Sequence, residues 1–171
     1  MDGDNELEIG VAGAYNYVVF DTDGSVLWTS PTIDTTSRIT GSSVFDFNSD
    51  GKSEVLYNDQ YFFRVYNGSD GKILFQTLNT SGTLLELPII ADIDNDNHAD
   101  IVLSSNSFAF GLQTGIIAFE GKNNDWANTR KIWNQHTYHI TNINDDGSIP
   151  RFEQPSWLAN NTYRSIPYLS A

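Results

Sequence analysis

Short runs of alternating apolar and polar residues recur along the chain, separated by turns rich in glycine, asparagine and aspartate. Alternation over four to six positions, with β-branched and aromatic side chains, predicts β-strands. Such runs cover residues 15–20, 25–28, 61–66, 72–75 and 115–119. Asp-Gly pairs at 23–24 and 70–71 separate neighbouring runs, which is typical of a β-hairpin. No stretch has a convincing helical period, so the pattern predicts an all-β fold.

Four acidic segments interrupt this pattern at a near-constant interval. They read DGDNELEIG from residue 2, DFNSDGKSE from residue 46, DIDNDNHAD from residue 92 and NINDDGSIP from residue 142. The equivalent aspartates are Asp4, Asp50, Asp96 and Asp146, with spacings of 46, 46 and 50 residues. An acidic stretch of low complexity does not keep such a period, so the segments mark internal repeats.

Each repeat has room for about four short strands, which is the size of one β-propeller blade. Residues 39–45 and 87–91 predict the strand that leads into an acidic loop. We therefore predict about three four-stranded antiparallel blades of propeller type. The predicted divisions are repeat 1 at 1–38, repeat 2 at 39–84, repeat 3 at 85–135, and a partial fourth repeat with a C-terminal strap at 136–171.

The second and third acidic loops place oxygen-bearing groups at alternate positions, numbered from the first aspartate. Positions 1, 3, 5, 7 and 9 are Asp46, Asn48, Asp50, Lys52 and Glu54 in one loop, and Asp92, Asp94, Asp96, His98 and Asp100 in the other. Position 7 would contribute its main-chain carbonyl, so its side chain is free to vary. Ca²⁺ takes six to eight oxygen ligands, which such a loop supplies, and we predict two calcium sites. Gly51 and Asn97 at position 6 suit the sharp turn that the loop needs.

An EF-hand shares the first positions of this pattern but requires a bidentate glutamate at position 12 and flanking helices. Position 12 is Tyr57 in the second repeat and Leu103 in the third, both within predicted strands. The fourth loop has Asn142, Asn144 and Asp146, but Pro150 replaces the acid at position 9. Its flank, residues 137–143, also predicts a strand. The fourth loop is therefore a degenerate site.

The first loop retains Asp2, Asp4 and Glu8 at positions 3, 5 and 9. Met1 then aligns with the apolar residue at position 2 of every other loop, and position 1 is missing. The expectation is a truncated third calcium site in a chain that continues upstream of Met1.

The segments DFNSDGKSE and ADIDNDNHADIVLS resemble the FG-GAP or VCBS-type calcium-binding repeats of β-propellers, like those of integrin α chains and bacterial surface proteins. The resemblance covers roughly residues 1–120. The segment from residue 130 to 164 is also similar to a stretch that accompanies such repeats in bacterial extracellular proteins. The resemblance implies blades with Ca²⁺ bound between their first and second strands, generally outside the cell.

About three blades are too few to close a propeller, which has four to eight. Three explanations stay open: further blades lie upstream, copies of the chain assemble, or the blades stack in another way. A strand around residues 138–143 that completes the first blade is another form of closure.

The composition of the chain excludes several classes of partner and of structure. The formal charge is −13, from 22 Asp plus Glu against 9 Lys plus Arg, and clustered basic residues for nucleic acid are missing. No run of about 18 apolar residues is present, so no membrane-spanning segment is expected. Disorder does not fit a chain with 39% hydrophobic residues, and the lack of cysteine excludes disulfides.

No nucleophile elbow, phosphate loop or dinucleotide motif is found, so the chain is not expected to be an enzyme. The leading hypothesis is an extracellular or cell-surface calcium-binding repeat module for adhesion, surface display or structural assembly, with a protein or glycan ligand. The alternative is a glycan-binding or accessory part of a polysaccharide-active enzyme. Its candidate exposed aromatic is Trp126, whereas the alternating strand aromatics are predicted to form the core between blades.

Overall fold

The computed structural model describes residues 1–171 except 39, 83–84, 109–110, 112, 159–162 and 167–171. The described chain is all-β, with three antiparallel sheets and a single helical turn, η1 (Ser156–Leu158), of the 3₁₀ type. This confirms the prediction of an all-β, antiparallel fold. No helix among the described residues has the length and apolar character needed to cross a bilayer.

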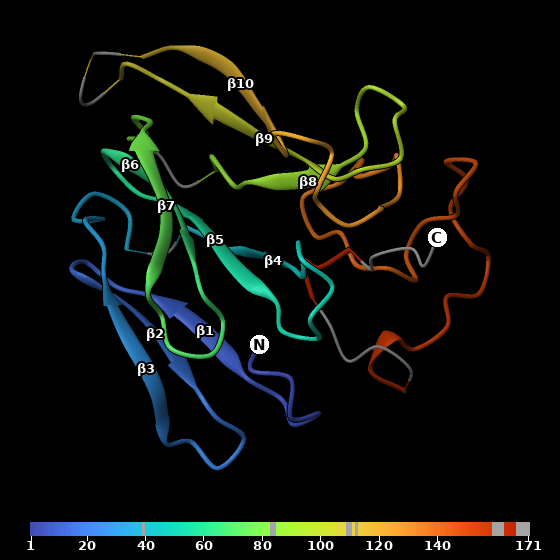
Figure 1. The fold of residues 1–171 in the computed structure, drawn as a ribbon, viewed down its shortest axis with the longest axis horizontal. Coiled ribbons are helices and arrows are strands. Elements are labelled where there is room, and N and C mark those ends of the chain that lie inside the picture. The colour runs from blue at the N-terminus through green and yellow to red at the C-terminus, as the bar shows by residue number, and fades with distance from the viewer. Residues whose placement is uncertain (39, 83–84, 109–110, 112, 159–162, 167–171) are drawn as a thin grey trace.

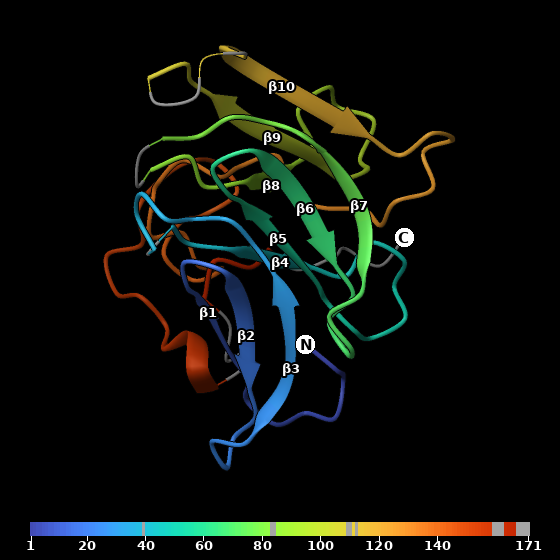
Figure 2. The ribbon, with the colours of Figure 1, turned by 90° about the vertical axis from the view of Figure 1, so that its left-hand side faces the viewer.

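The three sheets follow the chain in order and lie next to one another (Figures 1 and 2). Sheet 1 contains β1 (Ile9–Ala12), β2 (Asn16–Phe20) and β3 (Val26–Pro31). Sheet 2 contains β4 (Ser43–Phe45), β5 (Glu54–Asn58), β6 (Phe62–Tyr66) and β7 (Ile73–Leu78). Sheet 3 contains β8 (Ile89–Ala91), β9 (Asp100–Ser105) and β10 (Gly115–Glu120). Each sheet is a simple meander of sequential strands.

Only sheet 2 has the predicted four strands within the described residues. Sheet 1 begins with the strand equivalent to β5, and sheet 3 ends with the strand equivalent to β6. Residues 138–143, predicted as a strand, form turns instead. Tyr138 and Ile143 are nevertheless buried, because they insert into the core from a non-repetitive segment. The prediction of a strand in that stretch is therefore wrong.

Two apolar clusters hold the sheets together. The first lies between sheets 1 and 2 and contains Tyr17, Val19, Trp28, Val55, Tyr57 and Tyr66. The second joins sheets 2 and 3 to the C-terminal segment and includes Phe45, Leu56, Phe63, Ile90, Leu103 and Ile166. Alternate residues of β5 enter different clusters because successive strand side chains point to opposite faces. Tyr17, Phe63 and Tyr66 are thus core residues, as predicted, whereas Tyr15 of the same predicted set is 68% exposed because it lies at the turn before β2.

The C-terminal segment, which comprises the described residues from 121 to 166, packs on the sheets without adding a named strand. It touches strand β4 through a parallel bridge between Val44 and Ser165, and the Val44 N–H donates to the Arg164 carbonyl at 3.2 Å. It also touches the loop between β8 and β9, where His98 bridges Asn128. The segment therefore lies beside β4 and β8, which are edge strands of sheets 2 and 3 (Figure 1).

Candidate metal centres

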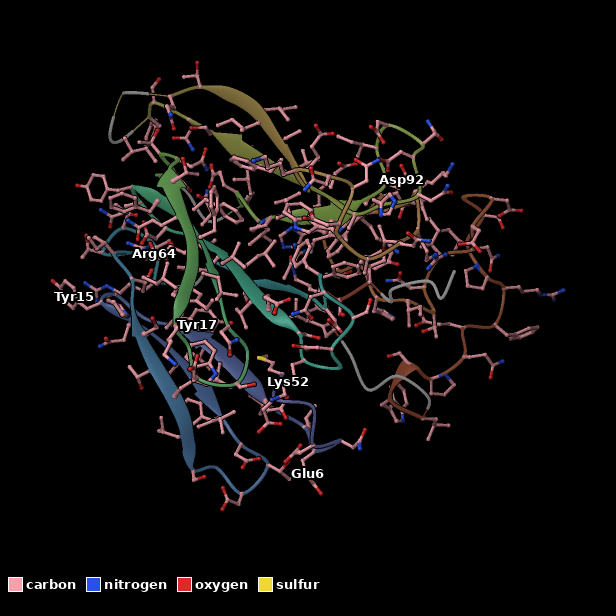
Figure 3. All side chains as sticks on the ribbon, in the orientation of Figure 1. Glu6, Tyr15, Tyr17, Lys52, Arg64 and Asp92 are labelled. Atoms are coloured by element: carbon pink, nitrogen blue, oxygen red, sulfur yellow. The ribbon has the colours of Figure 1, made fainter. Side chains whose placement is uncertain are left out.

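The first three acidic loops occupy equivalent places in the fold. Residues 46–53 join β4 to β5, residues 92–99 join β8 to β9, and residues 1–8 lead into β1. The first two loops touch, since a Cβ on Gly3 would lie 2.7 Å from the Gly51 carbonyl oxygen. Figure 3 shows Glu6 and Lys52 near this contact, whereas Tyr15 lies at the far end of sheet 1. The loops thus share their position relative to the strand that follows them.

The three loops also share an unusual backbone conformation. Position 4 has a positive φ at Gly3, Ser49 and Asn95, with values of 88°, 57° and 70°. Position 6 has a positive φ at Asn5, Gly51 and Asn97, with values of 71°, 86° and 76°. Glycine and asparagine tolerate this left-handed region best. The turn at position 6 was expected from the sequence, whereas the one at position 4 was missed although its residue types indicate it.

Side-chain oxygens at positions 3 and 5 are oriented by the same hydrogen bonds in all three loops. The N–H of position 5 donates to Oδ1 of position 3 at 3.1, 3.0 and 3.1 Å, in Asp2, Asn48 and Asp94. The N–H of position 7 donates to Oδ1 of position 5 at 2.8, 2.9 and 2.8 Å, in Asp4, Asp50 and Asp96. These Asx-type bonds hold each side chain against its own loop.

Positions 1 and 9 close the loop. The N–H of position 6 donates to Asp46 at 2.8 Å in the second loop and to Asp92 at 3.1 Å in the third. The N–H of position 2 donates to Glu54 at 3.1 Å and to Asp100 at 2.9 Å. In the first loop the amino group of Met1 makes this contact with Glu8. Met1 therefore makes the same contact with position 9 as Phe47 and Ile93 do at position 2 of their loops, in agreement with the alignment.

Carboxylate oxygens converge in the first and third loops. One oxygen from each of Asp2, Asp4 and Glu8 lies within 4.8 Å of the others. The same holds for Asp92, Asp94 and Asp100, of which Asp92 and Asp100 are buried. In the second loop Asp46 and Glu54 are buried, and Asn48 donates its amide to Asp50 at 3.1 Å. Hard oxygen ligands at this spacing suit a cation such as Ca²⁺.

The acids of these loops repel one another. Burial raises the pKa of Asp100, and the charges of Asp94, Asp96 and Asp92 raise it further. Burial likewise raises the pKa of Glu54, with added repulsion from Asp46 and Asp50. A bound divalent cation would compensate this repulsion, because opposite charge favours the ionised carboxylates.

The third loop has neighbours that sequence reasoning missed. Lys131 lies 3.6 Å from Asp92 and donates to Asn95 at 3.0 Å. Asn124 donates to Asp96 at 2.6 Å, and His98 Nδ1 contacts the Trp126 carbonyl at 2.7 Å. Lys131, Asn124 and Trp126 belong to the C-terminal segment, and no local pattern around residues 92–100 predicts their contacts with the third loop.

The fourth loop shares only part of this geometry. Gly147 has a φ of 83°, and the Ser148 N–H donates to Asp146 at 2.9 Å, as at positions 6 and 7 of the other loops. Asn142 instead donates to the Thr137 carbonyl at 3.0 Å, and Asn144 donates to Ser148 at 2.9 Å. The amide groups of Asn142 and Asn144 thus make local hydrogen bonds that the other three loops do not share, and Asn142 Oδ1 accepts from the His139 N–H at 3.3 Å.

Trp126, predicted as an exposed aromatic, is half-buried. Its ring meets Phe47 edge-on, with centroids 4.8 Å apart. It lines a cavity of about 480 Å³ between sheets 2 and 3, together with Phe75, Phe119 and Glu120. The packing on Phe47 follows from the approach of the C-terminal segment, which the local sequence does not encode.

No family model and no curated protein matches the chain. Among solved structures, it is similar to the crystal structure of the V. cholerae biofilm matrix protein Bap1, with a TM-score of 0.86 and 32% sequence identity. The match covers 95% of this chain and 28% of that chain. The chain therefore spans a little over a quarter of the length of the protein it matches.

Proposed function

We propose that this chain is a calcium-stabilised, non-enzymatic part of an extracellular matrix or adhesion protein. The observation that carries the proposal is the geometry shared by the first three acidic loops, including their paired left-handed residues and Asx-type hydrogen bonds. The likeness to a biofilm matrix protein over 95% of this chain supports the extracellular role. The FG-GAP or VCBS resemblance of the loops supports the same class.

Calcium fits the residues of the loops. In the third loop it would be held by Asp92, Asp94, Asp96, the His98 carbonyl and Asp100, and the second loop offers the equivalent set with Asn48 in place of one acid. The first loop offers three carboxylates, and the fourth only a degenerate set. A bound cation supplies positive charge that offsets the repulsion among acids and fixes the start of the following strand.

The sheets fit blades of a larger propeller or assembly. They succeed one another in space, and adjacent sheets pack face to face through aromatic clusters. Three blades do not close a ring, because propellers have four to eight. We therefore propose that the described sheets pack against further blades, supplied by the same polypeptide or by other copies.

Calorimetry with chelator and with added ion tests the calcium proposal. Ca²⁺ at a hundredfold excess over its dissociation constant should stabilise the fold by about 2.7 kcal/mol per site relative to EDTA. Asp23→Asn, an exposed hairpin acid outside the loops, serves as the matched control and should respond as the unchanged protein does. An identical melting temperature in EDTA and in calcium would refute the proposal.

A second candidate function, glycan binding, is favoured by the cavity between sheets 2 and 3. Its walls combine the aromatic rings of Phe75, Phe119 and Trp126 with the carboxylate of Glu120. Aromatic faces beside hydrogen-bonding groups are suited to sugars. A glycan array tests this role: binding that Trp126→Ala removes and Trp157→Ala retains would support it, and an array without binding would count against it.

A further inference from the structure

A second pocket, of about 270 Å³, lies between the chain that leads into β8 and the C-terminal segment. It contains none of the predicted metal ligands. One wall is apolar, and the other carries nitrogen donors. The lining residues that matter here are Leu85, Leu87, Ile89, Trp133, Gln135 and Arg164.

Arg164 is a buried cation with only neutral partners. Its Nε–H donates to the Ser42 carbonyl at 3.1 Å, and Nη2 donates to Ser43 Oγ and the Pro88 carbonyl, each at 3.1 Å. Nη1 donates to the His136 carbonyl. Among the described residues no carboxylate forms an ion pair with it. Buried charges in proteins are usually paired, so this guanidinium lacks the counter-charge it would be expected to have.

The backbone of Arg164 is strained. Arg164 has a φ of 50°, in the left-handed region that is uncommon for residues other than glycine. Burial lowers the pKa of Arg164 to about 10, so the side chain stays cationic at neutral pH. Strain of this kind persists where the surrounding structure fixes it, often at ligand-binding positions.

Two residues that line the pocket carry donors without a partner. Trp133 Nε1 and Gln135 Nε2 are buried and have no hydrogen-bond partner within the described part of the chain. The Trp133 ring is fixed by stacking on Tyr138, with centroids 4.5 Å apart, and by Arg164 at 5.2 Å over its face. Neither contact uses the indole N–H. A buried donor without an acceptor costs about 1–3 kcal/mol, which an incoming oxygen would recover.

We propose that this pocket binds a small organic carboxylate. The carboxylate oxygens would accept from Trp133 Nε1 and Gln135 Nε2, with Arg164 supplying the counter-charge. The apolar part of the ligand would lie against Leu85, Leu87 and Ile89. Two separate N–H donors match the two oxygens of a carboxylate, and the apolar wall distinguishes an organic acid from an inorganic anion.

Titration of the calcium-loaded full chain with butyrate tests the assignment, read from the indole N–H resonance of Trp133 in ¹⁵N-labelled protein. Butyrate should shift this resonance saturably, whereas butyramide and sulfate, which lack the charge or the apolar tail, should bind at least tenfold more weakly. Trp133→Phe keeps the ring stack and removes the donor, and Gln135→Leu removes the second donor. Each should weaken butyrate binding about tenfold by calorimetry, since a hydrogen bond to a charged group is worth about 1.5–3 kcal/mol.

Trp157→Phe, at an exposed site outside the pocket, is the matched control and should bind butyrate normally. The proposal is wrong if butyrate leaves the Trp133 resonance unmoved, or if sulfate or butyramide binds as well as butyrate. Unchanged affinity in folded Trp133→Phe and Gln135→Leu would also overturn it. Because the pocket shares no residue with the metal loops, failure here leaves the calcium proposal untouched, and the converse also holds.

Discussion

Strands β1 and β5 follow equivalent acidic loops, yet they lie in different environments. Every residue of β5 is buried, whereas Ile9 and Val11 of β1 are 56% and 46% exposed. Strand β5 pairs with β4 on one edge and β6 on the other, and apolar clusters cover both its faces. Within the described part of the chain, strand β1 pairs with β2 and with no other strand. The burial of a strand is therefore set by the sheets and strands that pack against it and not by its own sequence pattern.

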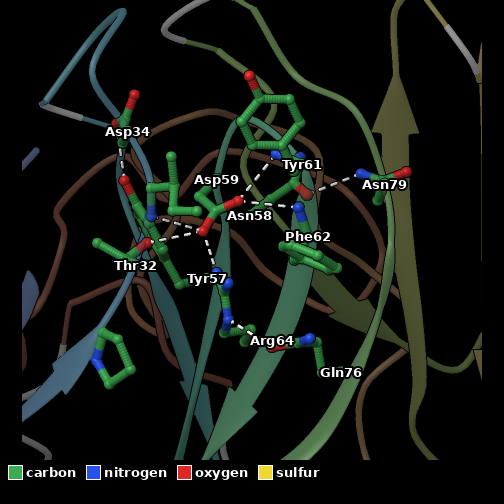
Figure 4. A network of polar contacts seen from close by, with 12 residues as sticks. Thr32, Asp34, Tyr57, Asn58, Asp59, Tyr61, Phe62, Arg64, Gln76 and Asn79 are labelled. Carbon is green, nitrogen blue, oxygen red and sulfur yellow. Dashed lines mark hydrogen bonds and ion pairs between the residues drawn. The ribbon is translucent and has the colours of Figure 1, made fainter. Parts of the chain in front are cut away.

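The turns that follow these strands differ in the same way. Asp59 follows β5 and is buried, with Oδ2 accepting from Thr32 Oγ1 at 3.0 Å and from the Ile33 N–H at 2.8 Å (Figure 4). It also pairs with buried Arg64. Gly13 holds the equivalent place after β1, and its N–H makes the same turn hydrogen bond as that of Asp59, at 2.8 Å against 2.9 Å. Of these two turns, the one after β5 carries the inter-sheet network.

The largest effect is expected from Asp59→Ala. Removing this carboxylate leaves Arg64 buried without its charge partner and frees two donors from the end of sheet 1. We expect a loss of about 3–5 kcal/mol in the free energy of unfolding. Urea unfolding measures it, with Asp23→Ala in the exposed hairpin of sheet 1 as the control. A loss below 1 kcal/mol would show that the network does not join the sheets.

Truncation within the two strands should come next in size. Leu56→Ala empties space in the core between sheets 2 and 3 and should cost about 2–5 kcal/mol. Ile9→Ala, in the half-exposed β1, should cost less than about 1 kcal/mol. Both values come from the same urea series. Equal losses would mean that β1 is covered in solution, for example by a further strand, and would remove the contrast between the strands.

The acidic loops allow a third comparison. Asp92→Asn changes a buried residue of the third loop, whereas Asp2→Asn changes a half-buried residue of the first loop. Asp92→Asn should abolish one calcium-dependent increment of about 2.7 kcal/mol at a hundredfold excess of ion. Asp2→Asn should remove less, because its carboxylate is closer to solvent and more strongly screened by water. Calcium titration followed by melting temperature distinguishes them, and a larger effect for Asp2→Asn would contradict this order.

The smallest effect is expected from the hydrogen bond between Tyr57 of β5 and Asp34 of the segment that joins β3 to β4. Tyr57 donates to Asp34 at 2.8 Å, and although burial opposes ionisation, hydrogen bonds from Ser37 and Tyr57 lower the pKa of Asp34 below its ordinary value of 3.8. Tyr57→Phe should cost about 1 kcal/mol at pH 7.

The pKa of Asp34 is lower in the folded than in the unfolded state. The stabilisation from ionised Asp34 is therefore fully present at pH values above the unfolded-state pKa and is lost as the pH falls through the folded-state pKa. The difference between the unchanged protein and Tyr57→Phe should therefore shrink in acid. Melting temperatures at pH 7 and at the lowest pH where both remain folded test this. A difference that widens in acid would assign the stabilisation to another group.

Much of the fold follows from short-range pattern. Strands β2, β6 and β10 lie within one or two residues of the predicted runs, because alternation and hairpin turns are local properties. The same reasoning failed at residues 138–143, where apolar spacing like that of a strand serves a turn segment inserted into the core. The spacing of apolar residues indicates which side chains are buried. Over only a few residues, however, it does not distinguish a strand from an irregular segment.

The repeat period, the all-β class and the loop conformation are encoded locally, since glycine, asparagine and aspartate favour left-handed turns and Asx-type hydrogen bonds within a few residues. Tertiary packing sets which strand of a repeat is buried, and it brings Lys131 and Asn124 to the third loop and Trp133 and Arg164 to one pocket. These outcomes depend on contacts between residues far apart in the chain. Such contacts arise when whole sheets pack, and no local spacing anticipates them.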